Sequence, residues 1–110
     1  MAGTKLVVIY PRPADVDAFE RAYQDEHVPL AVEKIKGMTK FIATKVVGSP
    51  GGATPAFYRI AELHFPSMEA LNEAASSVGA QEAVTHAVAI STGGEPIFLV
   101  AEEEEITTLG

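Results

Sequence analysis

The 110-residue sequence contains no cysteine and no tryptophan. The absence of cysteine excludes disulfide bonds, thiolate metal sites and cysteine nucleophiles, and it is typical of a protein from a reducing compartment. Basic residues are also scarce, because eight lysines and arginines stand against fifteen acidic residues, for a formal net charge of −7. A chain of this sign repels phosphate backbones, so we expect no nucleic-acid partner.

Long hydrophobic runs are missing as well. No stretch approaches the roughly 20 apolar residues of a membrane-spanning helix, and the N-terminal segment lacks the features of a signal peptide. We therefore expect a cytoplasmic protein that has no membrane partner. A composition with 47% hydrophobic and 21% charged residues is that of one globular domain. We expect it to span residues 1–110, with a core from about 4 to 101 and an acidic tail, 102–110, that either solubilises the protein or serves metal binding or docking.

The pattern of apolar residues predicts four strands and two helical regions. Strands are expected over 5–10, 39–47, 57–65 and 96–101, where β-branched and aromatic residues are bounded by proline or glycine. Apolar residues at steps of three and four predict a helix capped by Asp15. This helix should end or kink near His27, because Pro29 disfavours a helical residue before it, and a short piece over 29–36 can follow. The second helical region begins after Ser67 and is interrupted at Gly79.

The order β-α-β-β-α-β predicts an α+β, ferredoxin-like fold. In this fold a four-stranded antiparallel sheet carries helices on one face. The first and last strands are apolar on both faces, over 6–9 and 97–100, so the other face of the sheet would be bare and apolar. The simplest cover is a second copy related by a two-fold axis. We therefore expect a homodimer joined through the open sheet face, as a dimeric α/β barrel with a cavity between its layers.

Polar residues on the third strand give the first candidate site. Strict alternation places Tyr58, Glu62 and His64 on the face toward the barrel, and we take them as candidate substrate-binding residues. Arg59 then faces the helices near the end of the sheet. Glu62 and His64 are either an acid–base pair in a pocket or a structural polar pair at the dimer interface.

Three residues near the ends of the first strand and first helix are the catalytic candidates. His27 lies on the apolar stripe at the predicted helix end, where backbone carbonyls favour the imidazolium ion and burial opposes it. A histidine held near neutrality suits proton abstraction next to a carbonyl. Tyr23 lies one turn earlier and can orient the imidazole, and Tyr10 can donate to an enolate oxygen. The structural alternatives are a capping or core histidine and two core aromatic residues.

Cofactor and metal signals are weak. The glycines of the 48–55 loop do not form a phosphate-binding pattern, so we expect no nucleotide cofactor. The three histidines and Glu62 match no local ligand spacing, so we expect no metal site. We expect His86, on the last predicted helix, to lie at the surface.

The chain resembles the EthD family over about residues 4–105. The resemblance is carried by four pieces: Tyr10-Pro11, Phe19-x3-Tyr23-x3-His27-x-Pro29-Leu30, the segment from Tyr58 to Ser67, and Gly93-Gly94. It implies a ferredoxin-like monomer, a homodimer of the dimeric α/β-barrel superfamily and a small cavity without a cofactor. It raises the expectation that His27 is functional. Members often carry an acidic residue where this chain has His86, so the chemistry here can differ.

The resemblance implies several activities on small organic molecules. The family is associated with ether degradation, in which a haem-dependent oxygenase system performs the oxidation. Related barrels include isomerases, cyclases, decarboxylases and cofactor-independent monooxygenases. Haem-degrading relatives use a tryptophan and an asparagine, and this chain has no tryptophan and only Asn72. The hypotheses are therefore a cofactor-free enzyme acting on a small hydrophobic carbonyl or aromatic compound, a non-catalytic barrel that binds a hydrophobic ligand, and an accessory subunit of an oxygenase system.

Overall fold

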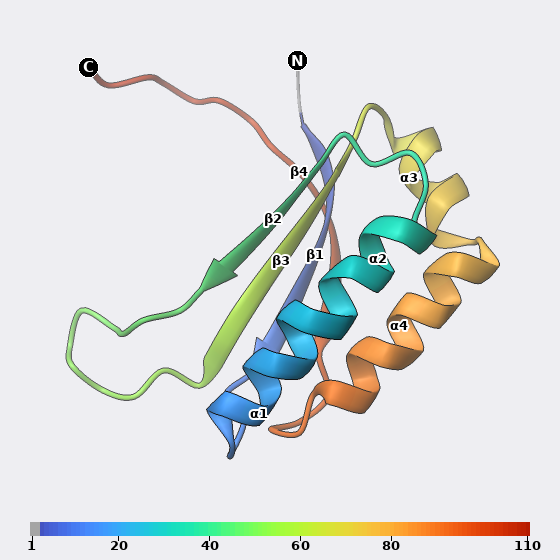
Figure 1. Ribbon diagram of the computed structural model, residues 1–110. Coiled ribbons are helices and arrows are strands. Elements are labelled where there is room, and N and C mark those ends of the chain that lie inside the picture. Colours follow the sequence, from blue (N-terminus) through green and yellow to red (C-terminus); the bar gives the residue numbers. More distant parts are fainter. Residues whose placement is uncertain (1–2) are drawn as a thin grey trace.

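A computed structural model describes residues 3–110 and shows one sheet with helices on one side. Strands β1 (Thr4–Pro11), β2 (Lys40–Lys45), β3 (Phe57–Phe65) and β4 (Ile97–Glu102) form an antiparallel sheet in the order β2-β3-β1-β4. The helices are α1 (Val16–Arg21), the π-helix η1 (Ala22–His27), α2 (Val28–Lys34), α3 (Met68–Ala75) and α4 (Val78–Ile90). They all lie on the same face of the sheet (Figure 1). The predicted ferredoxin-like α+β fold is confirmed.

The first helical region was predicted to end or kink near His27; it does not end there, and the irregularity is a π-helical turn over Ala22–His27. Asp15 caps it by accepting a hydrogen bond from the Ala18 N–H at 3.0 Å. Pro29 has no N–H to donate to the carbonyl four residues back. The π-helical turn accommodates this missing donor, because its hydrogen bonds run from an N–H to the carbonyl five residues back. One such bond runs from the Val28 N–H to the Tyr23 carbonyl. His27 therefore lies inside a helix that runs from Val16 to Lys34, and not at a helix end.

The second helical region breaks earlier than predicted. Ser67 caps α3 and Ser77 caps α4, each accepting a hydrogen bond from the N–H three residues on. Gly79 lies in the first turn of α4 and does not interrupt it. A side chain at this position would collide with the carbonyl of Lys34, at the end of α2. The glycine thus lets α4 approach α2 closely.

A β-bulge changes the predicted alternation of β3. Tyr10 pairs with Arg59, and Pro11 pairs with Phe57, so Tyr58 is the extra residue of the bulge. The Tyr58 ring packs against Phe19 of α1 at 5.9 Å between centroids. The prediction that Tyr58 shares a face with Glu62 and His64 is therefore wrong, because the bulge turns its side chain toward the helices.

The core fills the space between sheet and helices, while the other face of the sheet is open. Within residues 3–110 nothing covers that face. Its apolar side chains come from all four strands: Val7, Ile9, Ile42, Ile60, Ile97 and Leu99.

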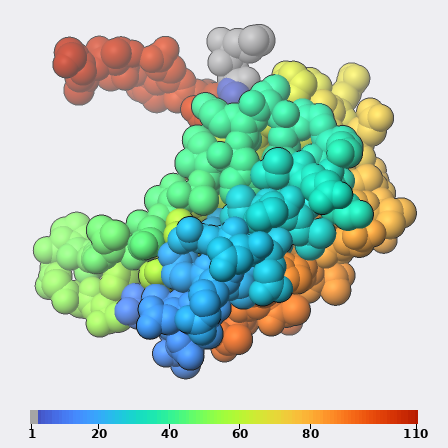
Figure 2. Space-filling model, viewed as in Figure 1, coloured from blue at the N-terminus to red at the C-terminus, as the bar shows by residue number. Residues whose placement is uncertain are grey.

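The loop between β2 and β3 and the exposed residues 103–110 extend from the body of the molecule (Figure 2). None of the helices in the described part of the chain has the length and apolarity to cross a membrane.

Candidate active site

A buried hydrogen-bonded chain links β1, η1 and α4. The hydroxyl of Tyr10 lies 3.2 Å from Nε2 of His27. On the other side of the ring, Nδ1 of His27 lies 2.9 Å from Nδ1 of His86. The planes of the two imidazoles differ by 9°, and their centroids are 5.1 Å apart, which is the geometry of two rings joined edge to edge by one hydrogen bond. The fold thus brings together three side chains that are 17 and 59 residues apart in sequence.

Two of these side chains are almost fully buried. Tyr10 is 1% exposed and His27 is 6% exposed. Burial, and to a smaller extent the neighbouring His86, lower the pKa of His27 to about 4. Burial likewise raises the pKa of Tyr10. At neutral pH the imidazole is therefore neutral and the phenol keeps its proton, so the pair offers one basic nitrogen and one hydroxyl donor.

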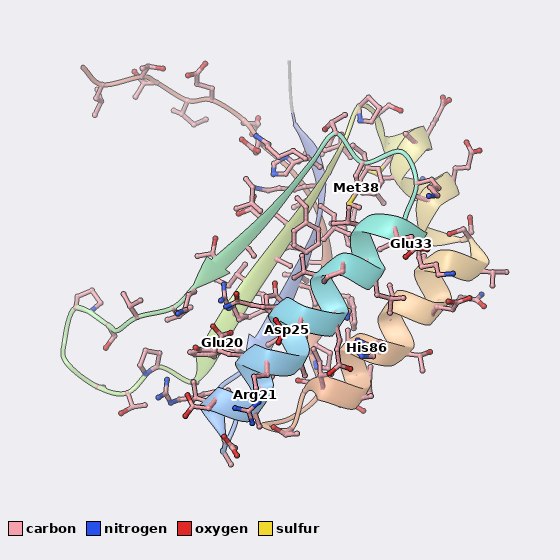
Figure 3. The ribbon with its side chains drawn as sticks, viewed as in Figure 1. Glu20, Arg21, Asp25, Glu33, Met38 and His86 are labelled. Carbon is pink, nitrogen blue, oxygen red and sulfur yellow. The ribbon has the colours of Figure 1, made fainter. Side chains whose placement is uncertain are left out.

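The position of His86 differs in part from the prediction. This residue was expected at the surface, but it is half-buried on the side of α4 that faces the first helical region (Figure 3). The buried residues of α4 are Ala80, Ala83 and Ala87. His86 lies three residues after Ala83 and one before Ala87, so the stripe of small residues was the signal that its side chain faces inward.

Tyr23 completes an aromatic cluster beside the histidine. Its ring lies 6.0 Å from that of His27 and 5.5 Å from that of Tyr10, measured between centroids. Its hydroxyl is buried and has no hydrogen-bond partner among residues 3–110. Burial raises the pKa of Tyr23 to about 12, so this hydroxyl keeps its proton at neutral pH.

An ion pair between Arg59 of β3 and Glu20 of α1 lies beside the aromatic cluster. Two nitrogens of Arg59 donate to the two carboxylate oxygens of Glu20, at 3.0 and 2.7 Å. The guanidinium lies 5.0 Å from the centre of the Tyr23 ring. Glu20 is seen extending from α1 toward the sheet in Figure 3. The hydrogen bonds from Arg59 hold the pKa of Glu20 below its ordinary value, so this pair stays charged and fixes the position of α1 on β3.

An apolar hollow adjoins the Tyr10–His27 pair. Its volume is about 30 Å³, and a second hollow of about 190 Å³ shares part of its lining. The shared residues are Leu6, Ile35, Val84 and Phe98. Tyr10 and His27 are the polar residues of the first hollow, and the rest of its lining is apolar. The hollow is therefore apolar except at the end formed by the Tyr10–His27 pair.

Glu62 and His64 do not join this site, because they lie on the opposite, open face of the sheet. Nε2 of His64 lies 3.2 Å from Oε1 of Glu62, and Nζ of Lys5 lies 2.9 Å from the same oxygen. Lys5 is also 3.6 Å from Glu103. The hydrogen bond from Lys5 holds the pKa of Glu62 below its ordinary value. Atoms of Glu62, His64 and Glu103 that could bind a metal ion lie within 4.8 Å of one another. The Lys5 ammonium already forms ion pairs with the two carboxylates of this group.

Comparison with known proteins decides the family. The EthD domain matches residues 11–88. The chain belongs to the EthD family. It is 32% identical over 99 residues to an uncharacterized 11.0 kDa protein of Rhodococcus erythropolis, from the thcB–thcC intergenic region, over 90% of this chain and 94% of that protein.

Solved structures show the same ferredoxin-like fold. An EthD family protein from Bacillus halodurans superposes with a TM-score of 0.85 and 29% identity, over 93% of this chain and 99% of that one. A dimeric ferredoxin-like protein of unknown function from Jannaschia sp. superposes with a TM-score of 0.62 and 18% identity, over 93% and 99% of the two chains. The ferredoxin-like fold of this EthD protein is thus shared well beyond its sequence relatives.

Proposed function

We propose that this protein is a cofactor-free enzyme that binds a small hydrophobic carbonyl or aromatic compound between its sheet and its helices. The observation that carries the proposal is the neutral His27, hydrogen-bonded to a buried tyrosine hydroxyl at the polar end of an apolar hollow. The family name of the Bacillus halodurans relative refers to ethyl tert-butyl ether. That name supports a place in the degradation of small organic molecules.

The chemistry is proton transfer next to a carbonyl. The C–H bond beside the carbonyl breaks, its proton goes to Nε2 of His27, and its electron pair moves onto the carbonyl oxygen as an enolate. The Tyr10 hydroxyl turns from Nε2 to this oxygen and donates to it, and the unpartnered Tyr23 hydroxyl is a second donor in the same cluster. Isomerisation, cyclisation, decarboxylation and cofactor-independent oxygenation can each proceed through such a carbanion.

The proposal includes a homodimer joined through the open sheet face. That face is apolar across all four strands, and a bare apolar surface of this extent is typical of an interface. The polar cluster of Lys5, Glu62, His64 and Glu103 lies on the same face. In a dimer it would form a polar border beside the apolar contact. The Jannaschia sp. protein, which shares the fold and is described as dimeric, supports this assembly.

Deuterium exchange tests the enzyme proposal with acetophenone, a small aromatic ketone, as the probe. In deuterated buffer the protein should speed the exchange of the methyl protons, and His27→Gln should reduce this exchange to the buffer rate. Gln24→Ala, an exposed change on the same helix, should keep the full rate. If the His27→Gln variant exchanges the probe as fast as the unmodified protein, His27 is not the base.

The small size of the first hollow favours a second candidate function. About 30 Å³ holds one or two water molecules and no organic ligand without adjustment. A protein of this kind can serve as an accessory subunit or a ligand carrier. Native mass spectrometry separates these functions, because a carrier retains a small molecule in the His27→Gln variant, whereas an accessory subunit carries none and forms a larger complex with its partner protein.

A further inference from the structure

We propose that His86 positions the proton of His27 and exchanges it with solvent, as the outer half of a two-histidine proton relay. The inference rests on the proposed function, since it supplies the proton route that a base at His27 requires. It concerns His86, at a position where the EthD resemblance predicts an acidic residue.

Two sets of proton positions fit these two distances, and the burial of the Tyr10 hydroxyl selects one, because Nε2 of His27 is its only hydrogen-bond partner among residues 3–110. Tyr10 is buried and protonated, so its hydroxyl donates to Nε2 of His27. The neutral ring of His27 must then carry its proton on Nδ1. That proton points at Nδ1 of His86, 2.9 Å away, which must therefore be the acceptor. His86 in turn carries its own proton on Nε2.

The outer end of the chain reaches the surface. Nε2 of His86 lies 3.8 Å from Oε1 of Glu26, whose side chain is 68% exposed. Exposure rises along the chain, from 1% at Tyr10 and 6% at His27 to 26% for the His86 side chain. His86 also lines a wide surface groove. The two histidines thus connect a dry interior to water in two steps.

The relay balances when a proton arrives at Nε2 of His27. The Nδ1–H bond of His27 breaks as its proton passes to Nδ1 of His86, and the Nε2–H bond of His86 breaks as its proton passes to Glu26 or to water. Both rings end neutral, with their protons on the opposite nitrogens. Reversal of the same steps returns a proton to the bound molecule. An acidic residue in place of His86 would also accept the hydrogen bond from His27. Its negative charge, however, would stabilise His27 in the imidazolium form.

Nitrogen NMR of the protein with labelled histidine rings tests the relay. In the unmodified protein at neutral pH we expect the Nδ1–H form of His27 and the Nε2–H form of His86. His86→Leu removes the acceptor and should raise the fraction of His27 in the Nε2–H form. His86→Asn keeps an acceptor oxygen but cannot pass a proton. It should therefore preserve the form of His27 and slow the exchange of its ring proton with water by about tenfold or more, since exchange then needs local opening.

The outcomes separate this inference from the enzyme proposal. His64→Asn, a buried histidine on the other face of the sheet, should leave the ring signals of His27 unchanged. An Nε2–H form of His27 in the unmodified protein would contradict the relay, and so would unchanged proton exchange in the His86→Asn variant. Neither result depends on turnover, so failed exchange of acetophenone leaves the relay standing, and a failed relay leaves the acetophenone test untouched.

Discussion

His27 makes the stability of the protein depend on pH in a defined window. Its pKa is about 4 in the folded protein against 6.5 as the ordinary value, so between these values the unfolded chain binds more protons than the folded one. Stability is therefore complete above pH 6.5 and falls as the pH drops toward 4, by about 3 kcal/mol in total. Urea unfolding across this range should show the loss, and His27→Gln should remove most of it. A variant with an unchanged slope would show that another group is responsible.

The two buried tyrosines should respond in opposite ways to loss of the hydroxyl. Tyr23→Phe removes a buried hydroxyl that has no partner, so the free energy of unfolding should stay unchanged or rise by about 1 kcal/mol. Tyr10→Phe removes the donor to Nε2 of His27, and stability should fall by about 1 kcal/mol. Chemical unfolding of both variants at pH 7 makes the comparison. Equal losses in the two would mean that the Tyr23 hydroxyl has a partner in solution.

Only part of the candidate site is predictable from single residues of the sequence. The shared stripe of Tyr23 and His27 follows from helical spacing, and Tyr10 follows from its place at the end of a strand. The partner of His27 does not follow, because His86 is 59 residues away and meets it only when α4 packs on η1. The sign of the His27 shift was also open, because it depends on burial that the sequence does not specify.

At the scale of elements, the order of strands and helices was predictable and two irregularities were not. Runs of β-branched and aromatic residues bounded by proline or glycine located β1 to β4 closely. Pro29 indicated an irregularity in the helix, but both a helix end and a π-helical turn are compatible with a residue that has no N–H donor. The side chain of Tyr58 faces the helices because of a bulge opposite Tyr10 and Pro11. A bulge of this kind cannot be predicted from the alternation of residues along a strand.

The packing of α4 on α2 depends on a glycine. A methyl group at Gly79 would collide with the carbonyl of Lys34, and such overpacking costs about 1–3 kcal/mol. This outweighs the roughly 1 kcal/mol by which alanine favours a helix over glycine. Gly79→Ala should therefore lower the melting temperature, while Gly51→Ala, with open space around it, should change it little. A stabilised Gly79→Ala would show that α4 stands farther from α2.

At the scale of the whole molecule, the open sheet face should determine assembly. Leu99 is 48% exposed on that face, and a glutamate there would place a charge in the proposed interface. Leu99→Glu should shift native mass spectra from dimer to monomer. Val47→Glu, at a loop position that is 91% exposed, should leave the dimer intact. A dimer that survives Leu99→Glu would place the contact on another surface.

The central claim is that the helix-side hollow ends in a neutral, buried imidazole. Titration of the His27 ring by NMR tests this claim most directly, because it needs no ligand and resolves one residue. The account predicts a pKa of about 4 for His27, with an unprotonated Nε2 at neutral pH. A ring that titrates at or above 6.5 would contradict it, since the imidazole would then be open to water and could not be the buried base of this site.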